Sequence, residues 1–331
     1  MQVSLITRDR GAAACTEREP AALSAAWSAL SGRREPPSIF LTPEWIAVAR
    51  GHDPASAITL AVGDPPCGVA ALARRADGTL SFAGGDLTDE QDVVAGAGDE
   101  RMVAEAVADW VVVQRPPRVL LEYVPEDRPT LDAFASALDA AGYRVRRERQ
   151  IAALSTALPE LFEAYVKSLG KKERHELRRK IRRLEAAGNA GFRFATDAER
   201  PAMLDRFFAL HRLSRGEKAG FMTPDVERFF RDIADALAPL DRLRLGALAF
   251  DGVDVAVLFA FAYEGTLALY NAAYDPGLAS LSVGIVSHAW ALRAAIDERF
   301  RTYDLLRGDE PYKYDLGAHE RWLARLVAER P

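Results

Sequence analysis

The sequence predicts a mixed α/β protein built from two similar domains. The chain has 331 residues, which is long for one hydrophobic core and favours two domains of roughly 150 residues each. Short apolar runs separated by glycine and proline turns have the pattern of strands, and longer stretches have helical periodicity. The order strand, strand, strand, helix, strand occurs once in each half, so we expect a repeated architecture.

In the first half, turn residues such as Gly63 and Gly78 divide the apolar runs, and Gly142 follows the last periodic residue of a helix. Glycine accepts the left-handed backbone that ends a helix. The expected elements are strands at 58–62, 68–73 and 80–83, a helix at 100–113, a strand at 119–123 and a helix at 130–141. We assign residues 1–150 to this N-terminal domain.

The second half repeats this order of elements, which favours duplication over coincidence. Sequence identity between the two halves is slight, so the repeat is one of architecture. Its expected elements are strands at 243–250, 255–263 and 267–272, a helix at 283–300 and a strand at 302–306. Helical patterns at 158–187 and 200–237 have no counterpart in the first half. The second domain, residues 151–331, is therefore expected to carry a helical insertion at 158–237.

Bulk properties exclude several classes of protein. The net charge of −5 argues against general nucleic-acid binding. Cys15 and Cys67 form no disulfide framework and fit a reducing cytoplasm, and no apolar run approaches the ~18 residues of a membrane span. The five histidines lack metal-ligand spacing, and neither a G-x-S-x-G elbow nor a P-loop is present. We expect a cytoplasmic protein without a metal.

One segment is strongly basic. Residues 171–183 contain eight Lys or Arg and two Glu, a local charge of +6. Leu177, Ile181 and Leu184 form an apolar stripe, so this segment is expected to be a helix that docks by its stripe and ends at Gly188. The opposite face could bind a CoA or other nucleotide phosphate, a tRNA backbone, an anionic lipid surface or a polyanionic glycan, or it could simply be solvated.

The most informative run is 303–313, where a short apolar strand leads into a segment rich in charged and tyrosine side chains. Ligands of α/β proteins bind beyond the carboxyl ends of strands, so this segment has the features of a site. Arg307 is expected to hold the loop by pairing with Asp309 or Asp304.

The run resembles the C-terminal signature of the FemAB-like and CelD-like acyltransferases, a branch of the GNAT superfamily. Tyr312 to Gly317 is similar to the branch's F/Y-K-x-x-x-G pattern, residues 270–276 to Y-x-x-x-Y-D-P, and the basic segment to K-x-R-x-x-L-R-R-x. The resemblance implies tandem GNAT-like domains with mixed, largely antiparallel sheets. It also implies a CelD-type acetyltransferase of cellulose or polysaccharide biosynthesis, and a first domain that has lost its own active site.

Acyl transfer to an amine needs a base, an oxyanion stabiliser and a proton for the leaving group. Under the resemblance, Glu310 or Asp309 is the expected base and Tyr312 the donor of a proton to the leaving thiolate. Lys313, which matches a lysine at the catalytic site of FemAB-like ligases, is the strongest catalytic candidate. It would stabilise the oxyanion or a donor phosphate, in a loop at the cleft between the domains.

The acyl donor, acetyl-CoA or another acyl-CoA, is expected at Ser282, Val283 and Gly284, where a helix begins. Unpaired N–H groups and the helix dipole favour a pyrophosphate there. Ser282 is a candidate N-cap, and Gly284 would allow close approach. The segment departs from the usual Q/R-x-x-G-x-G/A loop, because it has one glycine and no arginine, so an ordinary capped helix remains an alternative.

Acceptor contacts are expected from side chains near this donor site. Tyr270 and Asn271 are adjacent on a strand, so one of the two should face the cleft, and His211 fits a packing role better than a basic one. The expected acceptor residues are Tyr270, Asn271, Tyr274, His211, Arg212, Lys171 and Arg178, with Lys218 as a further candidate.

The sequence therefore favours an N-acyltransferase that moves an acetyl or acyl group from acyl-CoA to an amine on a sugar, amino acid or peptide. Envelope or polysaccharide biosynthesis is the implied setting. A FemAB-like aminoacyl-tRNA-dependent transferase, with tRNA on the basic helix, is the first alternative. A non-catalytic scaffold that binds an anionic partner through residues 171–183 is the second.

Overall fold

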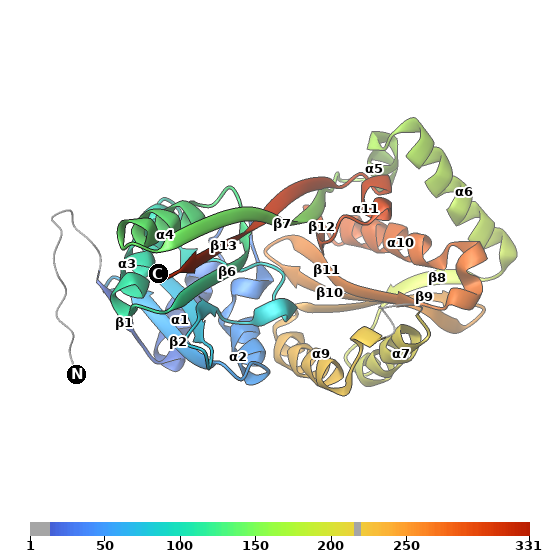
Figure 1. Cartoon of the computed structure of the whole chain (residues 1–331). Helices are drawn as coiled ribbons and strands as arrows, with labels where there is room; N and C mark the ends of the chain where they lie inside the picture. The colour runs from blue at the N-terminus through green and yellow to red at the C-terminus, as the bar shows by residue number, and fades with distance from the viewer. Residues whose placement is uncertain (1–13, 215–219) are drawn as a thin grey trace. The chain divides into compact units, whose positions relative to one another are not determined.

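The computed structural model describes residues 14–214 and 220–331. The chain forms two compact units: unit 1 comprises Met1–Ile151 and Trp322–Pro331, and unit 2 comprises Ala152–Arg321 (Figure 1). The sequence placed residues 151–331 in one domain, whereas this division assigns the last ten residues to unit 1. The mixed α/β class expected from the sequence is confirmed.

Unit 1 contains a sheet with the strand order β1-β2-β3-β4-β6-β13-β7, and β5 pairs with β3. The pairing of β4 with β6 is parallel, while β2, β3 and β4 form antiparallel pairs. Its elements are β1 (Cys15–Glu17), α1 (Pro20–Ser31), η1 (Ile39–Leu41), α2 (Pro43–Gly51), β2 (Ser56–Val62), β3 (Gly68–Arg74), β4 (Leu80–Phe82), η2 (Gly85–Leu87), β5 (Val94–Ala95), α3 (Glu100–Gln114), β6 (Arg118–Pro125), α4 (Pro129–Ala140) and part of β7 (Arg144–Ala157).

The core of unit 1 forms where α3 packs onto the sheet. Val103, Val107 and Val111 recur at helical spacing and are buried. A Cβ atom at Gly68 would lie 2.4 Å from the Val103 side chain, so glycine permits this close helix–strand contact.

Unit 2 contains a sheet with the order β7-β12-β11-β10-β9-β8. The β11–β12 pairing is parallel, and the pairs from β11 to β8 are antiparallel. In Figure 1, α7 and α9 cover one face of this sheet, and α10 covers the other. Its elements are α5 (Phe162–Ser168), α6 (Lys171–Ala187), β8 (Ala190–Phe194), α7 (Arg200–Arg212), α9 (Pro224–Leu237), η3 (Ala238–Leu240), β9 (Leu243–Phe250), β10 (Val253–Tyr263), β11 (Thr266–Tyr274), η4 (Pro276–Leu281), α10 (Val283–Asp297), β12 (Thr302–Arg307), α11 (Pro311–Asp315) and part of β13 (His319–Glu329).

Two long strands are divided between the units. The end of β7 pairs with β12 in unit 2, although β7 follows the helix α4 of unit 1. The end of β13 pairs with β6 in unit 1, although β13 follows α11 of unit 2. The first half of the chain thus supplies the strand beside β12, and the second half supplies the strand beside β6.

The repeated order of elements is present in the structure. Tyr123 in β6 and Leu306 in β12 both have φ of 55°, which is uncommon for residues other than glycine, and they occupy equivalent strands. The helical stretch expected at 158–237 is interrupted by β8, which was not anticipated. Phe192 and Phe194 of β8 lie over Gly246 of β9, and this packing secures the short strand at the sheet edge.

Helix α6 spans Lys171–Ala187 and is followed by Gly188, as expected. Leu177 and Leu184 are buried, and Ile181 packs against the same core cluster, so the predicted apolar stripe is confirmed. Within residues 14–214 and 220–331, no helix has the length and apolarity needed to cross a bilayer.

Candidate active site

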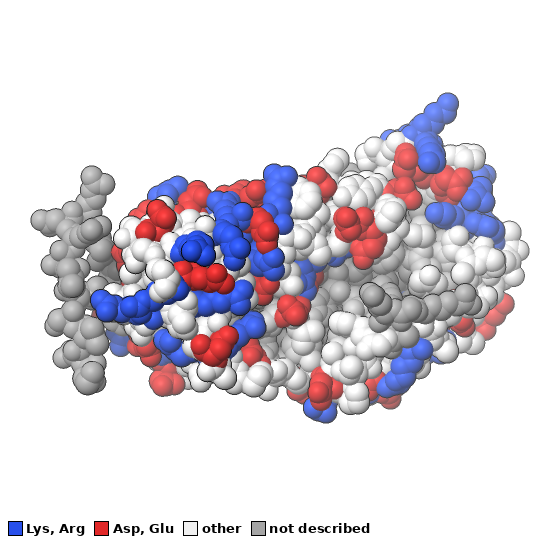
Figure 2. Space-filling view, in the orientation of Figure 1, with Lys and Arg blue, Asp and Glu red and all other residues white. Residues whose placement is uncertain are grey.

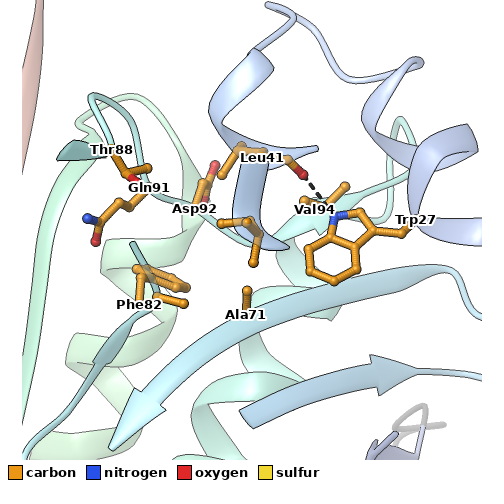
Figure 3. Close-up of a pocket in the computed structure, with 10 residues that line it drawn as sticks. Trp27, Leu41, Ala71, Phe82, Thr88, Gln91, Asp92 and Val94 are labelled. Atoms are coloured by element: carbon orange, nitrogen blue, oxygen red, sulfur yellow. Dashed lines mark hydrogen bonds between the residues drawn. The ribbon is translucent and has the colours of Figure 1, made fainter. Parts of the chain in front are cut away.

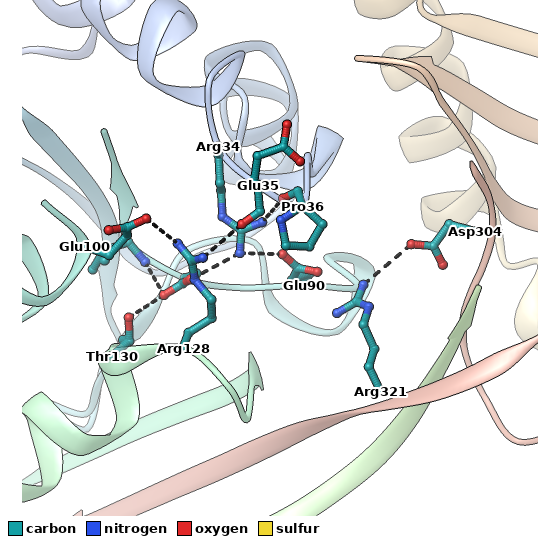
Figure 4. A network of polar contacts seen from close by, with 11 residues as sticks. Arg34, Glu35, Pro36, Glu90, Glu100, Arg128, Thr130, Asp304 and Arg321 are labelled. Atoms are coloured by element: carbon teal, nitrogen blue, oxygen red, sulfur yellow. Dashed lines mark hydrogen bonds and ion pairs between the residues drawn. The ribbon is translucent and has the colours of Figure 1, made fainter. Parts of the chain in front are cut away.

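Strands β11 and β12 form a fork in unit 2. They pair in parallel only at Thr266–Ala268 and Thr302–Asp304, although β11 continues to Tyr274 and β12 to Arg307. The backbone turns after the last pair, where the Leu306 N–H donates to Asp304 Oδ1 at 2.8 Å. Arg321 lies 3.6 Å from the other oxygen of this carboxylate (Figure 4). Strand β11 leads through η4 into α10, and the ring of Tyr274 at the end of β11 lies against Gly284 in the first turn of α10.

A β-bulge lies on β11 at the fork. Phe259 pairs with Asn271 and Ala260 pairs with Leu269, which leaves Tyr270 as the extra residue. Tyr270 contacts Phe230 of α9, with ring centroids 5.4 Å apart, and Asn271 Oδ1 lies 3.1 Å from His211 Nε2 on α7. Both residues therefore contact helices on the same face. The alternation behind the expectation that only one of them faces the cleft fails at this bulge, and which of the two faces a cleft stays a prediction.

His211 is fully buried. Its ring lies 5.6 Å from Phe207 and 5.7 Å from Phe221, and its Nε2 has Asn271 as a partner. This environment fits the packing role expected for it. Arg212, next in α7, is exposed and pairs with Glu227 of α9, while Lys218 lies outside the described residues.

The first turn of α10 offers backbone donors. Ser282 stands at the N-cap with φ of 58°, but its side chain caps no N–H group. The first intrahelical bond runs from Val286 N to Ser282 O. Among the described residues, the N–H groups of Val283, Gly284 and Ile285 have no acceptor. Together with the helix dipole they favour an anion at this end.

Arg183 of α6 adds a positive charge beside these donors. Its Nη2 donates to Ser282 Oγ at 3.3 Å, so the serine hydroxyl contacts an arginine and not the helix backbone. The Nε atom of Arg183 is buried and has no hydrogen-bond partner among the described residues. The sequence showed no arginine in the loop before α10. The structure supplies one from a distant helix, which only the basic run at 171–183 could have indicated.

Gly284 has a different environment from the one expected. A Cβ atom there would lie 3.0 Å from Cδ1 of Tyr274, so the tyrosine ring covers the helix turn. Tyr274 itself is 41% exposed. A larger residue here would push the tyrosine ring aside by a few tenths of an ångström.

Lys313 lies on α11, a short helix where a loop was expected. Its side chain is buried, and its Nζ donates to the carbonyls of Arg307 at 2.5 Å and Gly308 at 3.1 Å. Glu310 Oε2 lies 3.0 Å from the same nitrogen. An ammonium has three hydrogens, so these partners occupy it fully. The geometry fits a lysine that holds the β12–α11 turn, and direct contact with a reacting carbonyl stays a prediction.

The other residues of this segment differ in exposure. Glu310 is half exposed and Asp309 is exposed. Tyr312 is largely enclosed and stacks on His288, with ring centroids 5.0 Å apart and planes 17° apart. Burial, followed by the nearby Glu310 charge, raises the pKa of Tyr312. A tyrosine hydroxyl is already protonated at neutral pH, and the raised pKa extends that protonated range to higher pH.

Lys171 and Arg178 lie on the exposed face of α6. Arg178 pairs with Glu163 of α5 at 3.1 Å, and Lys171 has no acidic partner among the described residues. Within the described part of unit 2, neither side chain forms a hydrogen bond or ion pair with a residue of the fork.

The equivalent fork of unit 1 is filled by its own chain. Strands β4 and β6 pair in parallel at two positions, and the polar segment Thr88–Asp92, buried throughout, follows β4. Gln91 N donates to Tyr123 O at 3.1 Å, which ties this segment to β6. The adjoining cavity measures about 10 Å³, which suffices for one water molecule (Figure 3).

A buried polar network fixes this segment. Asp92 accepts from Thr130 at 2.5 Å and lies 3.2 Å from both Arg34 and Arg128 (Figure 4). Arg34 also pairs with Glu90 at 2.8 Å. These partners compensate the buried carboxylates, so the segment is well anchored.

The sequence was compared with known proteins. Residues 171–314 match the model of an acetyltransferase (GNAT) domain. No curated protein matches the chain at a significant level.

Solved structures match across both units. The crystal structure of FemX has a TM-score of 0.68 at 12% identity, covering 94% of this chain and 96% of that one. A conserved protein of unknown function from Bacteroides thetaiotaomicron gives 0.63 at 12% identity, with 96% and 100% covered. A tandem GNAT protein from the clavulanic acid biosynthesis pathway gives 0.54 at 12% identity, with 96% and 98% covered.

These matches confirm the expected fold class of tandem GNAT-like domains. The CelD-like branch receives no support of its own from them. No group of three or more His, Cys, Asp or Glu side chains is placed to hold a metal ion in the part of the chain that is described.

Proposed function

We propose that this protein is an N-acyltransferase that transfers an acyl group from acyl-CoA to an amine. The observation that carries the proposal is the anion site beside the β11–β12 fork. There the first turn of α10 has three unpartnered N–H groups, and Arg183 donates to Ser282 at its N-cap. A fork of this kind in a GNAT-type fold offers both an edge for an extended donor arm and a helix terminus for its pyrophosphate.

The reaction requires few groups. The amine nitrogen attacks the thioester carbon, the C–S bond breaks, the leaving thiolate takes a proton, and the amine gives one up. Tyr312, kept neutral by burial, is the proposed proton donor to the thiolate. Glu310 and Asp309 remain the proposed bases, since both carboxylates are open to solvent beside α11. Lys313 would hold the turn that presents all three.

The acceptor is proposed to lie near the end of β11, where Tyr270 and Asn271 contact α9 and α7 and Tyr274 lies against Gly284 of α10. Tyr270 and Asn271 are partly accessible, and Tyr274 is exposed. An amine on a sugar, amino acid or peptide fits such a mixed aromatic and amide surface, and a role in polysaccharide or envelope biosynthesis is part of this proposal.

Calorimetric titration of the nucleic-acid-free protein with acetyl-CoA tests the proposal. We expect one site per chain, and Arg183→Gln should weaken binding about 10- to 100-fold, because hydrogen bonds to charged groups contribute about 1.5–3 kcal/mol. Arg228→Gln is the control, since Arg228 is exposed on α9 and pairs with Asp225. Absence of binding, or equal binding by Arg183→Gln and the wild type, would rule out this donor site.

The second candidate is an aminoacyl-tRNA-dependent transferase. Its support is the fold similarity to FemX together with the cations of α6. RNA that copurifies with the protein and is released by salt would favour this candidate, and release of free CoA from acetyl-CoA in the presence of amines would favour the first.

A further inference from the structure

Helix α6 presents a face rich in basic side chains, which also carries one histidine. Lys171, Lys172, His175, Arg178, Arg179 and Arg182 are all exposed. Steps of three, four and seven residues relate them, so they share the helix face opposite the buried Leu177 and Leu184. Glu176 lies beside Arg179, and the exposed Glu185 follows Arg182 by three residues. Acidic side chains therefore border this set of six residues, which we call the basic face.

The charge of the basic face is only partly compensated. Arg178 pairs with Glu163 at 3.1 Å and Arg179 with Glu176 at 2.6 Å. Lys171, Lys172 and Arg182 have no acidic partner among the described residues. Figure 2 shows lysine and arginine side chains along α6. Mutual repulsion of cations held this close costs folding energy unless an anionic surface lies against them.

The geometry of the basic face is that of a flat strip. From Lys171 to Arg182 it runs about 17 Å along one straight helix, at 1.5 Å per residue. Residues 171–187 include no Phe, Trp or Tyr and one histidine, whereas proteins that bind single-stranded nucleic acids stack successive bases on several aromatic rings. The strip therefore fits an extended anionic plane better than a single-stranded polymer.

An exposed apolar side chain adjoins the strip. Leu161, at the N-cap of α5, is 67% exposed and stands two residues before Glu163, the partner of Arg178. A phosphate backbone gains nothing from a leucine, but a bilayer interface accepts one among cations.

We infer that the basic face docks this protein on the surface of an anionic lipid bilayer, with Leu161 at the contact. Each Lys or Arg near such a surface strengthens binding about fivefold at moderate salt. The attachment is peripheral and electrostatic, because the apolar stripe of α6 is already buried in unit 2. It goes beyond the proposed acyl transfer and does not depend on it.

Cosedimentation with vesicles tests the inference. We expect the full chain to bind vesicles that contain phosphatidylglycerol, not vesicles of phosphatidylcholine alone, and to dissociate as salt rises. The triple variant Lys171→Gln, Lys172→Gln, Arg182→Gln should bind about 100-fold more weakly, and Leu161→Ser should weaken binding further.

The matched control is Arg33→Gln, Arg75→Gln, Arg228→Gln, which removes the same charge from exposed positions elsewhere. Equal loss in both triple variants would show that net charge acts without a defined face and would overturn the inference. Absence of binding to the anionic vesicles would also overturn the inference. The same holds if the chain fails to bind vesicles but binds a single-stranded RNA oligonucleotide. Melting curves of both variants check that they fold.

Discussion

Replacement of Lys313 by methionine distinguishes a lysine that holds the turn from one that acts on substrate. Methionine keeps the length of the buried chain but removes the ammonium. In the wild type, Lys313 Nζ donates to the carbonyls of Arg307 at 2.5 Å and Gly308 at 3.1 Å, and both carbonyls would lose this donor in the variant. An unsatisfied buried group costs about 1–3 kcal/mol, so we expect the variant to lose about 2–4 kcal/mol of unfolding free energy. The pair with Glu310 adds little, because that carboxylate is 56% exposed.

Urea unfolding followed by circular dichroism measures this loss, and the exposed Lys167→Met on α5 is the control. The variant should unfold at a clearly lower urea concentration, while the control should match the wild type. If Lys313→Met unfolds like the wild type and yet loses activity, the ammonium acts on the substrate and the positioning role is refuted.

Three further predictions follow from the site and from unit 1. Tyr312→Phe should lower the transfer rate about 100-fold without weakening acetyl-CoA binding in calorimetry, because one proton donor is lost. Since burial raises the pKa of Tyr312 above 10.0, this hydroxyl in the wild type should stay protonated at pH values where a free tyrosine ionises. If the transfer rate declined already at pH values well below 10 because Tyr312 ionises, this prediction would be contradicted. Gly284→Ala should displace Tyr274 and lower the melting temperature, and Tyr274→Ala in the same chain should restore it; an unchanged melting curve for the single variant would refute the close contact. Arg34→Met should destabilise unit 1 by about 3–5 kcal/mol in urea unfolding, because it leaves Asp92 and Glu90 short of a partner, while acetyl-CoA binding in unit 2 stays intact.

Local patterns predicted much of the fold. The strand expected at 243–250 and the start of α10 at Val283 agree with the structure, because strong apolar periodicity and turn residues mark both. Strands β7 and β13 were missed. The first half of β7 is a charged run, and β13 mixes charged residues with large apolar ones. Their pairing partners lie far away in the chain, so no local signal indicated them.

The site shows the same limit. The sequence located the segments around Ser282 and Lys313, but it could not give the direction of a side chain. The bulge that turns both Tyr270 and Asn271 to one face depends on the register with β10. The contact of Arg183 with Ser282 joins residues 99 positions apart. The ammonium of Lys313 finds all its hydrogen-bond acceptors because the backbone takes a left-handed turn at Leu306 and Gly308. Only the folded backbone reveals this turn.

The central claim is that α10 and Arg183 hold the pyrophosphate of an acyl-CoA donor. A crystal structure of the protein soaked with acetyl-CoA tests it most directly. The account predicts pyrophosphate oxygens within hydrogen-bond distance of the N–H groups of Val283 to Ile285 and of the Arg183 guanidinium. Acetyl-CoA bound elsewhere, with these groups still without an anion, would contradict it.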